Sequence, residues 1–325
     1  MSCNHPLTAF LTGVKTINGA DDYVIGREGD PVFRVDDAVK RGHEVDLSNC
    51  PNVSWQGYSY LTDPIPIPCG HCIGCRMDRA KDWKVRCCLE SVSHRESWFV
   101  TLTYDDAHLP TSRVDGRPVL RKDDLQSFFK RLRYYFGDQR FRYFACGEYG
   151  ENTLRPHYHF ILFCDRLDAV QASDGIFRSS WISSSWTFGL IDIKRADVGT
   201  MAYVAGYVEK KQKDAHYDEY RVKPFILMSR RPGLGLSQLK AFSLVRSGKV
   251  YGDFGSCHSA SAPRLFLEKV RDDPLFDDLH ALRVFCGKSI TRAYTDYFRS
   301  SPVVFGHELD RLKIESLKGK RKPKI

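Results

Sequence analysis

Between Trp98 and Lys213 the chain alternates short β-rich runs with longer stretches in which apolar residues recur at helical spacing. β-branched and aromatic residues concentrate in four runs, which predicts strands at 98–106, 141–150, 155–163 and 188–196. Apolar residues recur every three or four positions in two other stretches, which predicts amphipathic helices at 122–136 and 198–213. The first of these helices should be capped by Asp123 and ended by Gly137.

The order of these elements is strand, helix, strand, strand, short helix, strand, helix, which is typical of an α+β fold. We expect an antiparallel-rich sheet with helices packed on a face, in which 141–150 and 155–163 are neighbours across a Gly/Asn loop. Further helices are predicted at 76–93 and 277–298. The sequence thus suggests a cysteine-rich N-terminal region, a central core and a mostly helical C-terminal region with a basic tail, at residues 1–97, 98–215 and 216–325.

Composition narrows the class of partner. The chain has 325 residues, 42% of them hydrophobic, and a formal net charge of +9. A basic surplus of this size favours a polyanionic partner, most often nucleic acid. We find no apolar run near the ~20 residues that cross a bilayer and no secretion signal in MSCNHPLTAF, so we expect no membrane association.

A histidine pair provides the first candidate site. Side chains alternate along a strand, so His157 and His159 in the third predicted strand should share one face. The preceding strand ends near Glu148, and a hairpin would bring this carboxylate beside the two imidazoles. Two nitrogens and one oxygen with open positions suit a catalytic Mg²⁺ or Mn²⁺. Glu151 is an alternative third ligand, and two histidines at a solvated strand end are the alternative interpretation.

A tyrosine pair provides a candidate reactive group. Tyr203 and Tyr207 are four residues apart in the last predicted helix of the core, so both lie on one face. Beside a metal site, a tyrosine oxygen can attack a DNA phosphodiester and form a covalent phosphotyrosine. Lys210 and Lys211 follow within a turn and are candidates to stabilise the developing charge. Ordinary packing of half-buried tyrosines is the alternative interpretation.

Eleven cysteines in a chain without an export signal indicate reduced thiols or metal ligands rather than a disulfide framework. In CGHCIGC, Cys69, Cys72 and Cys75 follow one another at two-residue gaps, a spacing that suits a structural, tetrahedral Zn²⁺. Unbound thiols and an iron–sulfur cluster are alternatives, although no downstream Cys-Pro completes the cluster pattern. The fourth ligand stays open, with Cys3 entered in our expected set and other candidates at His5, His71, Cys50 and Cys87.

Several segments together resemble a known family. RPHYHFILF, YVAGYVEKK and WFVTLTYDD look like the three motifs of HUH endonucleases that start rolling-circle replication. PCGHCIGCRMDRAKDWKVRC and PFILMSRRPGLG are similar to segments of the replication initiators of gokushovirus-type microviruses, which are small single-stranded DNA phages. The resemblance runs from about Cys3 to about Gly235, and the two-tyrosine segment is its most specific part.

The resemblance implies an RRM-like antiparallel sheet with flanking helices, the HUH nuclease fold. Its substrates would be single-stranded and replicative-form phage DNA in the host cell cytoplasm, nicked at the origin and extended by a host DNA polymerase. The chain carries no Walker-type GxxxxGK[ST] motif, so we expect unwinding to depend on a host helicase. The resemblance also implies individual roles: metal ligands for His157, His159 and Glu148, nucleophiles for Tyr203 and Tyr207, and phosphate contacts for Lys210 or Lys211.

Two other functions remain open from the sequence. PCGHC matches the cysteine half of the zinc deaminase signature, and His94 and Glu96 supply a His-x-Glu, but in reversed order. A non-catalytic, zinc-stabilised DNA-binding protein would need only a basic surface, with structural histidines and tyrosines. Replacing both tyrosines with phenylalanine separates the three functions, because only a strand transferase would lose cleavage while keeping DNA binding.

Overall fold

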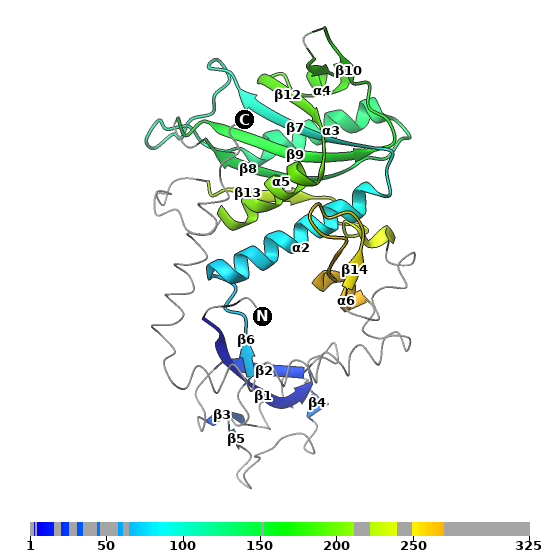
Figure 1. Cartoon of the computed structure of the whole chain (residues 1–325). Helices are drawn as coiled ribbons and strands as arrows, with labels where there is room; N and C mark the ends of the chain where they lie inside the picture. Colours follow the sequence, from blue (N-terminus) through cyan, green and yellow to red (C-terminus); the bar gives the residue numbers. More distant parts are fainter. Residues whose placement is uncertain are drawn as a thin grey trace. The chain divides into compact units, whose positions relative to one another are not determined.

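The computed structural model describes the chain in separate segments, which are residues 3, 5–15, 21–25, 31–34, 44–45, 58–60, 65–150, 153–173, 175–210, 222–238 and 249–269 (Figure 1). The chain divides into two compact units, one formed by Met1–Cys75 with Leu282–Ile325 and the other by Arg76–Ala281. The three-region division suggested by the sequence stays a prediction.

The larger unit is built on a five-stranded antiparallel sheet with the strand order β12–β7–β9–β8–β13. The four strands that the sequence predicts are present within two residues at each end, and β8 and β9 are antiparallel neighbours as expected. The sequence does not predict β13, because four residues after a proline are too few to show an alternation. The strands are β7 (Glu96–Tyr104), β8 (Arg142–Tyr149), β9 (Pro156–Cys164), β12 (Gly189–Arg195) and β13 (Phe225–Met228).

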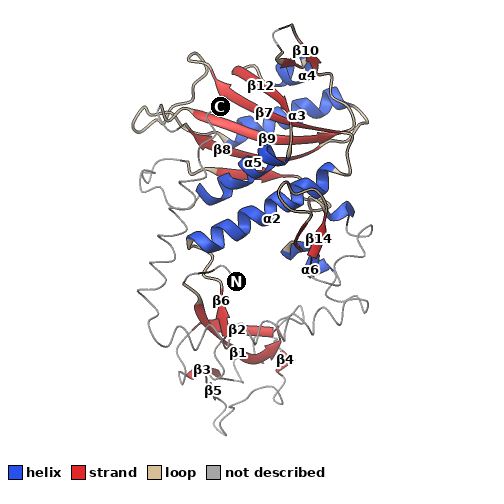
Figure 2. Cartoon of the chain, in the orientation of Figure 1, coloured by secondary structure: helices blue, strands red, loops and turns tan. Residues whose placement is uncertain are grey.

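Helices cover both faces of this sheet, which confirms the α+β class (Figure 2). α3 (Lys122–Phe136) and α4 (Ser180–Ser185) pack on one face, and α5 (Val198–Lys210) packs on the other with α2 (Ile73–Ser91). Neighbouring residues of β9 serve different faces, since Phe160 is buried in the cluster under α3 and Ile161 in the cluster under α5. The edge hairpin of β10 (Val170–Gln171) and β11 (Phe177–Arg178) completes this part.

Helix α3 has the predicted bounds but not the predicted cap. Gly137 ends the helix with a φ of 56°, and its N–H donates to the carbonyl of Tyr134. The N-cap residue is Arg121, which makes no side-chain cap hydrogen bond, so the prediction of Asp123 as the cap is wrong. Asp123 lies inside the first turn, where its carboxylate favours the positive end of the helix without capping it.

The described part of the C-terminal region contributes to the core of the larger unit. Phe254 and Phe266 are buried in the same cluster as Ile161 of β9. The helix predicted at 277–298 lies outside the described residues. The elements here are η2 (Leu236–Gln238), the antiparallel pair β14 (Lys249–Tyr251) and β15 (Ser259–Ser261), and α6 (Arg264–Lys269).

The smaller unit contains short antiparallel strands that the sequence does not predict. β1 (Leu7–Lys15) pairs with β2 (Asp21–Ile25), β4 (Glu44–Val45) and β6 (Ile65–Ile67). β3 (Pro31–Arg34) pairs with β5 (Tyr58–Tyr60). Across the described segments of both units, no helix combines the length and apolar character that crossing a membrane requires.

A buried ion pair fastens α2 to the sheet. Glu90 is 1% exposed and lies 2.7 Å from Nε of Arg142 on β8 and 3.1 Å from Nε2 of His94. Its carboxylate also accepts the backbone N–H of Gly235 at 2.6 Å. Burial alone would raise the pKa of Glu90, but the hydrogen bonds and the charge of Arg142 outweigh it and hold this pKa below its ordinary value. One carboxylate thus joins three segments that are distant in sequence.

We expect Glu90→Gln to lower the free energy of unfolding by about 3 kcal/mol near neutral pH, because the charge of Arg142 loses its buried partner. Since folding lowers the pKa of Glu90, its contribution is complete above the pKa of an unfolded glutamate, about 4.3, and is lost as pH falls through the folded-state pKa. Urea unfolding at a series of pH values measures both effects.

The matched control is Glu268→Gln, which removes the exposed pair with Arg264 and should change stability by less than about 1 kcal/mol. Equal losses in the two variants would contradict a structural role for Glu90. So would a loss in Glu90→Gln that does not shrink at acidic pH.

Candidate functional site

The register of the β8–β9 hairpin gathers the predicted metal ligands. Glu148 lies directly opposite His157, and Cys146 lies opposite His159. Alternation along the strands then puts Glu148, His157 and His159 on the face that α5 covers. Nε2 of His159 is 3.1 Å from Oε1 of Glu148, and both side chains are largely buried. The alternative ligand Glu151 lies outside the described residues.

Two threonines of β7 hold the imidazoles from behind. Thr101 is paired with His159 and Thr103 with His157 across the β7–β9 ladder. Nδ1 of His159 hydrogen bonds with Oγ1 of Thr101 at 2.9 Å, and Nδ1 of His157 with Oγ1 of Thr103 at 3.0 Å. Sequence reasoning missed these residues, although the threonines repeat every second position as the histidines do. Only the pairing of β7 with β9 makes the shared period meaningful.

Helix α5 presents both tyrosines to His159. The Tyr207 ring stacks on His159 with centroids 5.4 Å apart and an interplanar angle of 3°. The Tyr203 ring meets His159 edge-on at 5.8 Å, and the Tyr207 hydroxyl donates a hydrogen bond to the Tyr203 hydroxyl. Phe99 of β7 also lies parallel to His159, with centroids 5.9 Å apart. Tyr203 is 50% exposed, whereas Tyr207 is 5% exposed.

The charges in this cluster are coupled through Glu148. Burial and then the negative charge of Glu148, which also hydrogen bonds with the Tyr207 hydroxyl, raise the pKa of Tyr207. Burial, together with the neighbouring His159, lowers the pKa of His157 below its ordinary value. The neutral imidazole is the form that binds metal ions. A cation beside Glu148 would therefore meet an imidazole in its ligating form and a hydroxyl that shares its carboxylate.

The donor set is open rather than closed. The ring centroids of His157 and His159 are 6.2 Å apart. A Cβ atom on Gly150 would come within 3.0 Å of Nε2 of His157, so the glycine keeps this nitrogen accessible. Open coordination positions are characteristic of catalytic rather than structural metal sites.

The lysines expected near the phosphate are not located by the structure. Lys210 is the last residue of α5, but its side chain lies outside what the structure describes. Lys211 lies beyond the described part of that helix. Their role stays a prediction.

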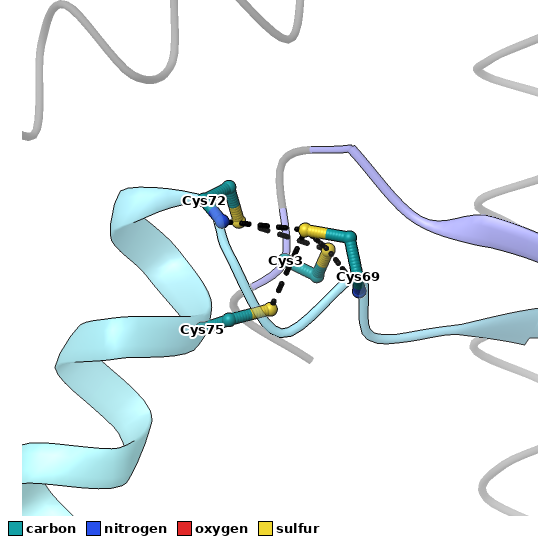
Figure 3. A group of neighbouring side chains, drawn as sticks. All are labelled: Cys3, Cys69, Cys72 and Cys75. Atoms are coloured by element: carbon teal, nitrogen blue, oxygen red, sulfur yellow. Dashed lines mark hydrogen bonds between the residues drawn. The ribbon is translucent and has the colours of Figure 1, made fainter. Parts of the chain in front are cut away.

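The four expected cysteines come together at the start of α2 (Figure 3). The Sγ atoms of Cys3, Cys69, Cys72 and Cys75 all lie within 4.8 Å of one another, and the group could hold a metal ion such as zinc. Of the other candidates for a fourth ligand, Cys87 is buried in the hydrophobic cluster of the larger unit and Cys50 lies outside the described residues.

The residues of the deaminase signature have other partners. His94 hydrogen bonds with Glu90, and Glu96 accepts the indole N–H of Trp98 and the backbone N–H of Leu167. Within the described segments, the group of metal-ligating side chains that contains Cys69 and Cys72 includes no histidine. The two halves of the signature are therefore not assembled into a deaminase site.

The sheet and its cluster of phenols, imidazoles and a carboxylate define a protein with a candidate metal-dependent site. Residues 97–212, which span β7 to α5, match the family model of the replication-associated protein ORF2. This segment belongs to that family, which confirms the resemblance to phage replication proteins that the motifs indicate.

Three curated phage proteins are similar to this chain. Replication-associated protein ORF2 of Spiroplasma virus 4 is 33% identical over 212 residues, which cover 61% of this chain and 65% of the relative. Replication-associated protein ORF4 of Chlamydia phage 1 is 32% identical over 197 residues, with 56% and 46% covered. Replication-associated protein VP4 of Bdellovibrio phage phiMH2K is 30% identical over 189 residues, with 54% and 58% covered. The matches thus span less than two thirds of each relative's length, and no solved structure matches the chain.

Proposed function

We propose that this chain is a metal-dependent DNA endonuclease and strand transferase of the HUH class, which initiates rolling-circle replication of phage DNA. The match of residues 97–212 to phage replication-associated proteins supports the biological role. One observation carries the chemistry: Glu148 contacts both His159, at 3.1 Å, and the hydroxyl of Tyr207. A cation held by the first contact would therefore adjoin the second.

The donor set fits a divalent cation that prefers nitrogen and oxygen ligands. The threonines occupy Nδ1 of each imidazole, which leaves Nε2 of His157 and His159 as ligand atoms, and Glu148 adds an oxygen. Mg²⁺ or Mn²⁺ bound there would polarise the scissile phosphate as a Lewis acid.

Tyr203 is the proposed first nucleophile, because half of its surface is exposed. Its hydroxyl oxygen bonds to the phosphorus of the scissile phosphodiester and gives up its proton, and the bond from phosphorus to the 3′ oxygen breaks. The 3′ oxygen takes up a proton and leaves as a 3′ hydroxyl, while the 5′ phosphate stays on the tyrosine. Because the phosphotyrosine conserves the phosphodiester energy, a later 3′ hydroxyl can displace the tyrosine and reseal the strand.

The remaining parts of the proposal extend this reaction. Tyr207, four residues further along α5, would cut a second time while Tyr203 holds the first end. Lys210 and Lys211 would contact the phosphate. The substrates would be single-stranded and replicative-form phage DNA in the host cell cytoplasm, with a host helicase and DNA polymerase as partners. The five-stranded antiparallel sheet with helices on both faces is compatible with an RRM-like HUH fold.

The tyrosine assignment is tested with single-stranded oligonucleotides that tile the genome encoding the chain. With Mn²⁺, the wild-type protein should form a covalent DNA adduct, and mass spectrometry should find it on Tyr203. Tyr203→Phe should lower first cleavage by about 100-fold or more, because the accessible nucleophile is lost. Tyr207→Phe should still cleave but should not transfer a strand between two oligonucleotides.

Tyr134→Phe is the matched control, because Tyr134 is 83% exposed on α3 and outside the site. It should behave as the wild type does. An undiminished adduct in the Tyr203→Phe/Tyr207→Phe double variant would place the nucleophile elsewhere. DNA binding without any adduct would instead identify a non-catalytic DNA-binding protein.

The threonine contacts give an independent test of the metal site. Thr101→Val and Thr103→Val should weaken Mn²⁺ binding by about 10-fold to 100-fold, because an Nδ1–H without its acceptor no longer holds Nε2 in the ligating tautomer. The corresponding Thr→Ser variants keep the hydroxyl and should restore affinity. Calorimetric titration with Mn²⁺ in the absence of DNA measures the effect.

Thr111→Val is the control substitution, since Thr111 is an exposed threonine outside the cluster. Wild-type Mn²⁺ affinity in the Thr101→Val/Thr103→Val double variant would refute the positioning role of both hydroxyls. It would leave the tyrosine assignment untouched.

A further inference from the structure

We propose that Cys3, Cys69, Cys72 and Cys75 form a closed tetrathiolate site for a structural Zn²⁺, chemically distinct from the proposed catalytic site. The inference rests on sulfur geometry, on the backbone around the sulfurs and on burial, and none of these observations involves the DNA reaction.

The spacing of the sulfur atoms matches the edges of a zinc tetrahedron. Four sulfurs about 2.3 Å from one ion, at tetrahedral angles, lie about 3.8 Å from one another. The Sγ of Cys3 is 3.6 Å from that of Cys69 and 3.7 Å from that of Cys72, and the Sγ of Cys69 is 4.0 Å from that of Cys75. These side chains point toward one another from different segments (Figure 3).

The same distances exclude the covalent alternatives. A disulfide brings two sulfurs to about 2.05 Å, and all four cysteines are free thiols. An iron–sulfur cluster with several irons interposes metal and sulfide atoms between its cysteines, so their sulfurs stand further apart than around a single ion. The geometry therefore favours one tetrahedral ion, and zinc is the redox-inert ion that such sites take.

The surrounding backbone supports thiolates in this arrangement. The N–H of Cys69 donates to the Sγ of Cys3 at 3.3 Å, and the N–H of Cys72 donates to the Sγ of Cys69 at 3.3 Å. The backbone of His5 hydrogen bonds with the Sγ of Cys3, and that of Gly70 with the Sγ of Cys75. Hydrogen bonds to the ligand atoms are the outer contacts that orient metal ligands.

The site has no room for substrate. Cys3 is fully buried, Cys72 is 6% exposed and Cys75 is 8% exposed. Four protein ligands fill a tetrahedral zinc ion, whereas a catalytic zinc keeps an open position for water. The role assigned to the ion is therefore to fasten chain segments. It joins the residue at position 3 and the turn at 69–72 to the first turn of α2 (Ile73–Ser91).

The position of the site also suits its charge. Four thiolates and one Zn²⁺ carry a net charge of about −2, and Cys72 and Cys75 lie at the start of the 19-residue helix α2. The N-terminus of a helix carries a partial positive charge that stabilises an anionic group. The site thus lies at the end of the helix that favours it electrostatically.

The test is the metal content of the full-length protein, purified without added metal and assayed without DNA. Elemental analysis should find about one zinc per chain. Replacing zinc with Co²⁺ should give the intense visible bands and thiolate charge-transfer bands of a tetrahedral cobalt–sulfur site. Cys3→Ser and Cys75→Ser should release the metal to a chelator at least about 100-fold more readily than the wild type.

Cys257→Ser is the matched control, because Cys257 is an exposed free cysteine outside the cluster, and it should retain zinc fully. His157→Ala/His159→Ala should also retain zinc, which separates this site from the proposed catalytic one. Absence of zinc, iron in its place, or a cobalt spectrum without thiolate bands in the wild-type protein would each overturn the inference. None of these results would affect the proposed nicking reaction.

Discussion

The candidate site depends on the register between β8 and β9. Glu148 pairs with His157 and Cys146 with His159, so a slip of one residue would turn the carboxylate to the face packed on α3. The polar residues do not set this register themselves. Further along β9, Phe160 and Ile161 are fully buried in clusters on opposite faces, and exchanging them would cost both clusters their packing. Burial of apolar side chains at one end of the strand thus determines where the imidazoles lie at the other.

Local patterns in the sequence were sufficient for the parts of the molecule that depend on neighbours in the chain. Alternation predicted the strands of the core, and helical spacing predicted α3 to the residue. The same two rules put His157 with His159, and Tyr203 with Tyr207, on common faces. The approach of Glu148 to the imidazoles followed from the shortness of the β8–β9 connection. What these patterns could not supply was a chemical role, which stays a proposal.

Contacts between distant segments were beyond a single sequence. Thr101 meets His159 across 58 residues, and Glu90 meets Gly235 across 145 residues. Neither contact leaves a local trace, because each depends on which strand or helix packs beside which. Cys3 shows the intermediate case: it was one of five candidates for a place beside Cys69, 66 residues away, and only the folded chain distinguishes it from the others. The strand pairs of the smaller unit, such as β1 with β6, are non-local in the same sense.

The surroundings of His159 have an energetic consequence. Its ring lies parallel to both Phe99 and Tyr207, and its Nδ1 is tied to Thr101. Rotation about either side-chain torsion would break these contacts, so the imidazole is already restricted to one rotamer by folding. The conformational entropy that a free side chain loses on binding is therefore lost before a ligand arrives. A preorganised imidazole of this kind lets more of the intrinsic binding energy appear as affinity, and the hydrophobic core under α5 is what makes that possible.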